Sequence, residues 1–599
     1  MSIAAPRRVG IAGLLGLLAG AIVLMPAPGN PGAVRLAGVG LLWWYAALAA
    51  PLAAVLLVIV VRRASPEAGT GAGGSAALAA WTSPVVLAFV AARVFSGAPE
   101  APTIALAILV APLIALLCPV TDAAQRPNRV AALGISAGVG LVLWANLLLL
   151  ADVAGLLGLP RWATSIVAAS AALLAVALLR GDTADEAGPR SFQAGLRSPG
   201  LWLLYVSGLG FVALVTVVAV ALAASPWGAW KDVASRPALT FGARNPWVTE
   251  GRTLAAPTTL EFTEAHRVTA LSPATYRVLE SGRLREWRLR AGESLSLRAG
   301  DHLVIGAGAR LMFEAGKRVP GAAASGATWA DPPERSGLST AVHALGAALT
   351  LVGGAVALVV PERALTIRGV ATGSGLVLAF VLGALCLGVY GAYSAPGLSI
   401  GAPALAAVFG VPDAVVPGRA GSALVVLSAV VLLLLLSATV LALRGVLGRA
   451  WGEVSTGESS GTHPPRALTD PAVAFLVVAA SIGSLWPGDA SRALLAGLGL
   501  TASAAVASRV AGDSPEARLA GSLAGVIAFA GLSVLGPRLP AWADVAWTYP
   551  ALAAAPLAWV VVRVETVRRA RRALQWPAAS EHGMLPRPRD ADTIGRHGE

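Results

Sequence analysis

The sequence is short of charged residues, lysine and cysteine. Only 13% of its 599 residues are Asp, Glu, Lys or Arg, whereas 56% are hydrophobic. A water-soluble chain of this length could not carry that composition without aggregating. The two cysteines, Cys118 and Cys386, lie far apart in apolar segments, which excludes a disulfide framework. The composition therefore predicts a polytopic integral membrane protein.

The few charges are mostly arginine, and the formal net charge is +13. In a soluble protein this excess would suggest nucleic-acid binding. Here the arginines lie mainly in short loops beside apolar segments, where basic residues orient membrane helices. Lys231 and Lys317, the two lysines, both lie in the one long polar stretch of the chain. We expect a lipid bilayer as partner and no nucleic acid.

Fourteen apolar segments approach the roughly 20 residues that cross a bilayer. Seven precede a polar insert at residues 225–338 and seven follow it. The predicted spans are residues 9–25, 36–61, 75–97, 102–118, 130–152, 163–180, 200–224, 340–360, 370–393, 420–446, 470–486, 489–508, 518–536 and 545–563. The predicted domains are therefore residues 1–224 and 339–563 in the membrane, the insert between them, and a disordered basic tail at 564–599.

Loop charges give the orientation. If the N-terminus is cytoplasmic, each cytoplasmic loop between spans holds at least two arginines, and the opposite loops hold one or none near each turn. The pairs are Arg62 and Arg63, Arg126 and Arg129, Arg190 and Arg197, Arg363 and Arg368, Arg449 and Arg466, and Arg509 and Arg518. This alternation predicts that both termini are cytoplasmic and that the insert lies outside a bacterial inner membrane.

Four arginines follow the last predicted span closely: Arg568, Arg569, Arg571 and Arg572. Such a cluster can bind anionic lipid headgroups, at about 1 kcal/mol per basic residue. The alternative is that these residues only hold the last helix in place.

The insert has the pattern of β-structure. Apolar residues alternate in six short runs, Thr258 to Phe262, Tyr276 to Leu279, Glu286 to Leu289, Ser294 to Leu297, His302 to Ile305 and Arg310 to Phe313. Two adjacent units nearly repeat, Leu289-Arg-Ala-Gly-Glu-Ser-Leu-Ser296 and Leu297-Arg-Ala-Gly-Asp-His-Leu-Val304. In each unit an Ala-Gly-acid turn separates two short strands. We predict a small all-β domain, either a sandwich or a barrel.

The run from Leu303 to Phe313 resembles the early strands of forkhead-associated domains, β-sandwiches that bind phosphothreonine. The resemblance covers fewer than about 30 residues, and the Gly-Arg pair usual in that family is replaced by Gly306-Ala307. It implies a sandwich. The replaced pair and the predicted location outside the cytoplasm remove phosphothreonine as the expected ligand.

A basic face of the insert is the candidate ligand or partner surface. Its residues are Arg283, Arg285, Trp287, Arg288, Arg290 and His302, with Arg298 nearby. Alternating arginines around a tryptophan could meet an envelope protein or an anionic glycan or lipid. Arginines on a solvent-facing edge strand also resist unwanted strand pairing, which is the simpler explanation.

No catalytic, metal or cofactor motif accompanies this surface. His266 and His302 are the only histidines of the insert, and Glu264 and Asp301 lie near them in sequence. Such pairs could serve acid-base catalysis, but no nucleophile motif or metal-ligand spacing is present. The alternative is that these histidines are solvated turn residues. We expect no cofactor and assign no catalytic residue.

Three functions fit this organisation. The preferred hypothesis is an envelope protein whose outer β-domain binds a partner protein, glycan or lipid during envelope assembly. Two halves of seven spans each would have opposite orientations, as in inverted-repeat transporters or flippases, and the proline-rich run from Ser394 to Gly418 could be a re-entrant segment. The layout also resembles peptidoglycan polymerases of the shape, elongation, division and sporulation family, which implies a lipid-linked glycan polymerase or ligase. None of that family's motifs is found here, so no residue is carried over.

Overall fold

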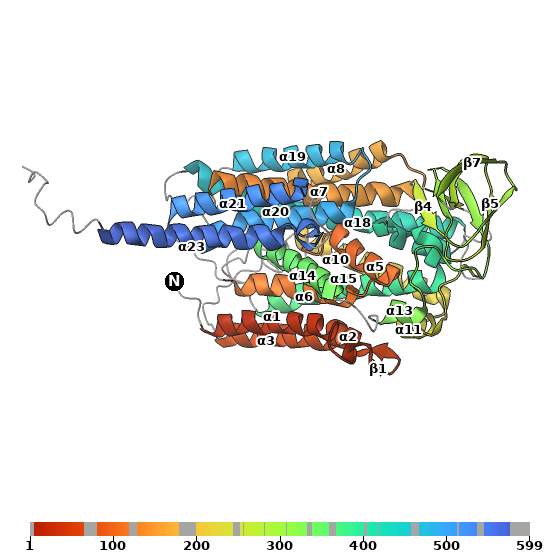
Figure 1. Cartoon of the computed structure of the whole chain (residues 1–599). Coiled ribbons are helices and arrows are strands. Elements are labelled where there is room, and N and C mark those ends of the chain that lie inside the picture. Colours follow the sequence, from red (N-terminus) through yellow and green to blue (C-terminus); the bar gives the residue numbers. More distant parts are fainter. Residues whose placement is uncertain are drawn as a thin grey trace, which may run out of the picture.

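The computed structural model is a long helical bundle with a small β-domain at one end. It describes residues 5–64, 81–118, 128–178, 199–242, 252–254, 257–280, 282–306, 308–331, 338–358, 367–400, 404–416, 418–456, 466–511, 514–535 and 544–575. Figure 1 shows the strands of the β-domain beyond one end of the bundle. The start of α1 (Ala5–Leu24) and the end of α23 (Ala551–Gln575) lie at the opposite end of the bundle.

The bundle helices match the predicted spans in position. Before the β-domain these are α1 (Ala5–Leu24), α2 (Leu41–Trp44), η2 (Tyr45–Ala49), α3 (Ala50–Ala64), α5 (Pro84–Ser96), α6 (Ala101–Leu117), α7 (Arg129–Gly155), α8 (Arg161–Leu178) and α10 (Pro199–Leu222). After it come α14 (Leu338–Leu358), α15 (Ile367–Ser394), α18 (Arg419–Thr456), α19 (Arg466–Gly483), α20 (Ala490–Val510), α21 (Pro515–Leu535), α22 (Asp544–Thr548) and α23 (Ala551–Gln575). Each predicted span overlaps one of them.

Nine helices in the described ranges are long and apolar enough to cross a membrane. This confirms a multi-pass helical protein. The count of fourteen spans stays a prediction, because α5, α6, α8 and α19 are shorter apolar helices and α23 is not among the nine.

Helix α5 begins inside the bundle and not at its surface. It has 13 residues, and Trp81, Thr82 and Ser83, which precede it, are at most 6% exposed. The first N–H groups of a helix have no partner within the helix, and hydrocarbon offers none. The start of α5 therefore needs hydrogen-bond acceptors from the protein itself.

Asn146 of α7 supplies one such acceptor. Its Oδ1 accepts a hydrogen bond from the Val85 N–H at 3.0 Å, and its Nδ2 donates to the Val142 carbonyl at 2.8 Å. Pro84 has no N–H, and the Ser83 carbonyl accepts the next two amides of the helix. Asn146 is fully buried, so it takes the place that water would have at an exposed helix end.

A second interruption lies between α15 and α18. Four short helical segments fill it: η5 (Pro396–Ser399), α16 (Ala404–Ala407), η6 (Val408–Gly410) and α17 (Val411–Val415). They lie against α5, α7, α10, α15 and α18, and most of their residues are buried. The sequence predicted a re-entrant or broken helix here, and the segment is broken. Pro403 and Pro417 lie outside the described residues.

The β-domain consists of two four-stranded antiparallel sheets. One has the order β3 (Arg252–Thr253), β10 (Arg310–Phe313), β5 (His266–Ala270), β8 (Ser294–Leu297), and the other β4 (Thr258–Glu261), β9 (His302–Ile305), β6 (Ala274–Glu280), β7 (Arg283–Leu289). Alternate residues of both sheets, such as Val268 and Leu311 of the first and Val278 and Leu303 of the second, are buried in one apolar core. The domain is therefore a sandwich, one of the two predicted forms.

A short stalk joins the sandwich to the bundle. It consists of the entering residues 236–241 and the leaving residues 316–319. These two segments pair, because the Phe241 N–H donates to the Lys317 carbonyl at 2.8 Å and the Val319 N–H donates to the Leu239 carbonyl at 2.9 Å. Both sides of the stalk are thus tied together before the chain reaches the membrane helices.

Two short helices at the base of the stalk pack against the bundle. They are α11 (Pro226–Ser235) and α13 (Gly326–Ala330). Trp230 of α11 lies between Trp43 of α2 and Trp329 of α13, with ring centroids 4.8 and 4.7 Å apart. The Trp329 Nε1 donates to the carbonyl of Val94, near the end of α5, at 2.8 Å. The three rings are at most 8% exposed, so the contact is a continuation of the bundle core.

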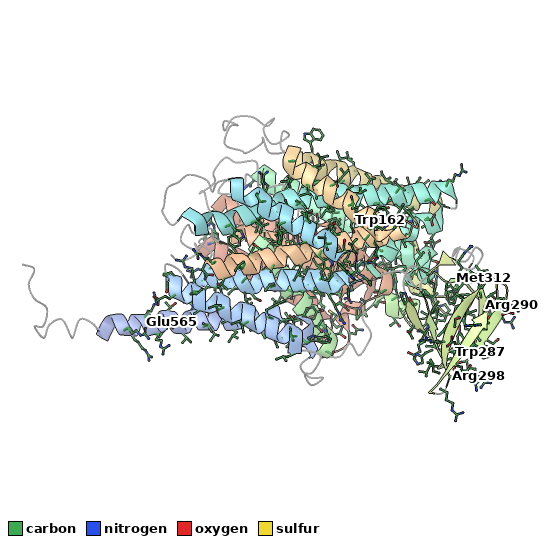
Figure 2. The ribbon with its side chains drawn as sticks, turned by 90° about the horizontal axis from the view of Figure 1, so that it is seen from above. Trp162, Trp287, Arg290, Arg298, Met312 and Glu565 are labelled. Carbon is green, nitrogen blue, oxygen red and sulfur yellow. The ribbon has the colours of Figure 1, made fainter. Side chains whose placement is uncertain are left out.

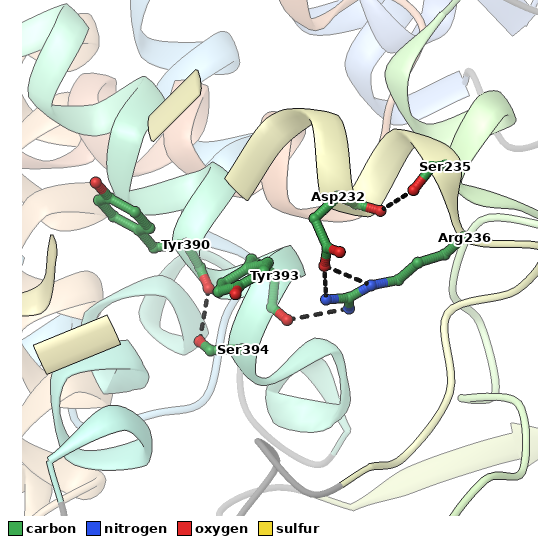
Figure 3. A network of polar contacts seen from close by, with 6 residues as sticks. All are labelled: Asp232, Ser235, Arg236, Tyr390, Tyr393 and Ser394. Carbon is green, nitrogen blue, oxygen red and sulfur yellow. Dashed lines mark hydrogen bonds and ion pairs between the residues drawn. The ribbon is translucent and has the colours of Figure 1, made fainter. Parts of the chain in front are cut away.

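Polar contacts complete this junction (Figure 3). The Arg236 guanidinium donates to the Tyr393 carbonyl at the end of α15, at 3.0 Å, and also to the Asp232 carboxylate. Arg35 forms an ion pair with Asp331 at 2.7 Å. Spanning helices from both halves of the chain therefore hold the β-domain.

Candidate functional site

The most exposed element of the sandwich is strand β7. Six of its seven residues are exposed, including Leu284 at 61% and Trp287 at 39%. Its neighbour β6, in contrast, buries Tyr276 and Val278. Among the strands that the structure describes, β7 is an edge strand and pairs with β6 alone, so it contributes little to the core.

The register of β6 and β7 divides the predicted basic face between two surfaces. Trp287 is the partner of Tyr276 and Arg285 the partner of Val278, so both lie on the inner face of the sheet, as does Arg283. Although they lie on this face, all three are exposed. Leu284, Glu286 and Arg288 lie on the outer face.

Strand β7 also has an open backbone edge. Two residues join β6 to β7, and Glu280 and Arg283 form the closing pair of the hairpin. Such a pair exchanges both backbone hydrogen bonds, and the next residue along the strand points its groups the other way. The N–H and C=O groups of Leu284, Glu286 and Arg288 therefore point away from β6.

The charge of this hairpin is positive. Arg283, Arg285 and Arg288 lie on the strand with Glu286, and Arg285 forms an ion pair with Glu280 of β6 at 3.1 Å. Both partners of that pair are partly exposed, so it contributes little stability and leaves the guanidinium available to a ligand. We call residues 283–288 the basic strand.

The other residues of the predicted surface are near the basic strand but not on it. Arg290 lies in the turn after β7, and Arg298 in the turn after β8. Figure 2 shows both of them projecting from the sandwich away from the helices. His302 is half-buried on β9, where its cross-strand partners are Glu261 and Leu279. It faces outward, on the surface opposite to Arg283 and Trp287.

The repeated sequence units form two equivalent turns that carry the chain from one sheet to the other. The Glu293 carboxylate accepts a hydrogen bond from the Arg290 N–H at 2.8 Å, and Asp301 accepts one from Arg298 at 2.7 Å. Gly292 and Gly300 both have φ of +87°. This explains the repeat, because the turn needs glycine at a positive φ and an acid one residue later.

We expect Gly300→Ala to destabilise the sandwich by about 1–2 kcal/mol, the usual cost of placing a β-carbon at positive φ. No atom lies within 4 Å of the added carbon, so the effect comes from the backbone alone. Gly306→Ala is the matched control, since that position is equally open and has no positive φ. Pulse proteolysis of the full-length protein in urea measures both. Equal midpoints would contradict this account.

His266 lies in the core of the sandwich, on a strand that the sequence did not predict. It is 3% exposed, and the rings of Phe241, Phe262 and Phe313 surround it at 5.2–5.9 Å. Within the described part of the chain, neither ring nitrogen has a hydrogen-bond partner. The prediction of a solvated turn residue is therefore wrong for His266, which is a buried residue of β5.

The burial of His266 makes the sandwich sensitive to acid. Desolvation lowers the pKa of His266, and Lys317 adds to this, while Glu314 and Glu264 partly oppose it. Above about pH 6.5 the imidazole is neutral in both the folded and the unfolded chain. As the pH falls below that value the unfolded chain takes up a proton that the folded sandwich resists, so stability falls by at most about 1.4 kcal/mol per pH unit.

We expect His266→Phe to remove this pH dependence and to keep the core filled. Pulse proteolysis in urea from about pH 8 to about pH 5 gives the slope. His302→Gln is the control, because it removes a histidine from the surface and leaves His266 in place. An unchanged slope in His266→Phe would show that another group is responsible.

The basic residues near the C-terminus belong to a helix. Helix α23 continues to Gln575, so Arg568, Arg569, Arg571 and Arg572 lie in its last turns and not in a tail that starts at residue 564. Arg569 pairs with Glu516 of α21, and Arg568 lies 3.9 Å from Glu565. Figure 1 shows that this end of α23 extends past the other helices. The rest of the predicted disordered tail, residues 576–599, falls outside the described residues.

Comparisons with known proteins do not identify the site. No family model, no curated protein and no solved structure matches it. In the ranges that the structure describes, no three His, Cys, Asp or Glu side chains come together in a way that could hold a metal ion. The exposed basic strand is therefore the feature from which a function can be argued.

Proposed function

We propose that this is a membrane protein of the bacterial envelope that uses its β-sandwich, outside the cytoplasm, to bind an anionic partner during envelope assembly. The observation that carries the proposal is the exposure of β7. Six of its seven residues face solvent, and they include three arginines and a tryptophan. Aromatic residues and arginine are the side chains most enriched in binding surfaces.

The junction supports the same function. A binding module is useful to a membrane protein when it is held at a fixed height and orientation. The tryptophan cluster and the paired stalk hold the sandwich against helices α2, α5 and α15. The alternating loop arginines favour the outer side of the membrane for the sandwich.

The test uses the full-length protein in nanodiscs of zwitterionic lipid and three anionic probes: an acidic peptide, a sulfated polysaccharide and vesicles containing phosphatidylglycerol. We expect the double variant Arg283→Glu/Arg285→Glu to bind the recognised probe about tenfold more weakly. Added salt should weaken binding by the unaltered protein.

Arg267→Glu/Arg310→Glu is the matched control. It makes the same charge change at two exposed strand residues of the opposite sheet. Equal losses in the two double variants would mean that only net charge matters. Binding of none of the three probes would overturn the proposed function.

A further inference from the structure

The open edge of β7 has the geometry of an incomplete sheet. The strand is seven residues long, lies at the end of its sheet and points the backbone groups of Leu284, Glu286 and Arg288 outward. An extended peptide can satisfy such a row of groups by adding to the sheet as a further strand. Glycans and lipid headgroups have no repeating N–H and C=O groups at the spacing of a strand.

The side chains of β7 define which peptide would fit. Arg283 and Arg285 on the inner face and Arg288 on the outer face favour acids in the positions opposite them. Leu284 and Trp287 are exposed apolar side chains that would pack against apolar neighbours. Glu286 favours a neutral polar neighbour. A second copy of β7 would bring like charges close together, so the same pattern disfavours self-association.

We propose that β7 binds an acidic, extended segment of a partner protein as an additional antiparallel strand. The proposal rests on the proposed function and specifies its partner. Every strand pair in the sandwich is antiparallel, and this pairing is also the more stable one per residue. In an antiparallel pair the first residue of the peptide lies opposite Leu289 and the seventh lies opposite Arg283. The peptide sequence that matches β7 in this register is Thr-Glu-Val-Thr-Glu-Val-Glu.

The experiment uses that heptapeptide, fluorescently labelled, with the full-length protein in zwitterionic nanodiscs. The amides of its second, fourth and sixth residues would face β7, and those of its third, fifth and seventh would face solvent. We expect N-methylation of the first set to weaken binding at least tenfold, because it removes about three hydrogen bonds. N-methylation of the second set should have a much smaller effect, although both peptides keep every charge.

A protein variant tests the backbone hydrogen bonds of β7 independently of the peptide. Glu286→Pro removes one outward N–H without breaking a bond to β6, since proline is tolerated on the open side of an edge strand. It also removes an acid, as does the control Glu286→Gln. We expect Glu286→Pro to lose peptide binding relative to Glu286→Gln, and both variants to bind the sulfated polysaccharide equally.

The outcomes separate this inference from the proposed function. If both methylated peptides bind as tightly as the parent, charge alone holds the peptide and strand addition is wrong. If the polysaccharide or the vesicles bind in a way that needs Arg283 and Arg285, and the peptide does not bind, the proposed function stands and the peptide partner is wrong. If no probe binds, both fail.

Discussion

Replacing Trp329 with alanine is expected to weaken the attachment of the sandwich to the bundle by about 3–5 kcal/mol, the usual loss for a buried tryptophan. Trp329 is 4% exposed and packs against Trp230 with the two rings tilted by 48°. It also donates to the Val94 carbonyl, which would lose that partner. The loss falls on the tryptophan cluster, which joins α13 to α2, α5 and α11.

Hydrogen exchange in the stalk measures this loss. The amides of Phe241 and Val319, which bond across the stalk, should exchange about a hundredfold or more faster in Trp329→Ala. Amides of the sandwich core, such as Val278, should change little. Trp287→Ala is the control, because it removes an exposed tryptophan from the same domain. Unchanged exchange in the stalk would mean that the tryptophan cluster does not hold the sandwich.

The second large effect is expected in the bundle. Asn146→Leu should lower the free energy of unfolding by about 2–3 kcal/mol, because it leaves the Val85 N–H without an acceptor in an apolar interior. Leucine has the branched side-chain skeleton of asparagine but bulkier methyl groups, so it leaves no cavity, and any overpacking adds to the loss of the hydrogen bond.

Thr439→Val is the matched control for this prediction. Thr439 is also buried, but its hydroxyl donates only to the Leu435 carbonyl of its own helix. Its replacement removes no partner from a helix end, so we expect a loss below about 1 kcal/mol. Thermal unfolding in detergent compares the two variants. A similar small loss in Asn146→Leu would show that water or another group caps α5.

The sequence predicts the parts of this fold that depend on local patterns. Apolar runs place a helix at every predicted span, and alternating residues place six of the eight described strands of the sandwich. The doubled Ala-Gly-acid unit predicts both turns between the sheets. Strand β5 was missed because it starts with His266, whose polarity hides the alternation of Val268 and Ala270. The sequence alone does not show that three phenylalanine rings surround the His266 imidazole.

Local sequence patterns do not predict contacts between segments that are far apart in the chain. Asn146 is visible as a polar residue in an apolar span, but its partner Val85 lies 61 residues away. The predicted basic face contained Trp287 and the three arginines that lie on β7, yet the predicted strand began at Glu286 and left out Leu284. The Ser281-Gly282 pair was the available signal, because such a pair commonly marks a hairpin turn. That turn sets the register and hence divides the arginines between two faces.

The cap on α5 also has a consequence for synthesis. Val85 is made 61 residues before Asn146, which at about 5–20 residues per second is an interval of about 3–12 s. During that time the start of α5 has no acceptor from α7. Helix α5 therefore reaches its final hydrogen-bonded position in the membrane only after α7 has been synthesised. Until then we expect it to stay beside the protein-translocation channel of the membrane or at the bilayer surface, where water can solvate its first amides.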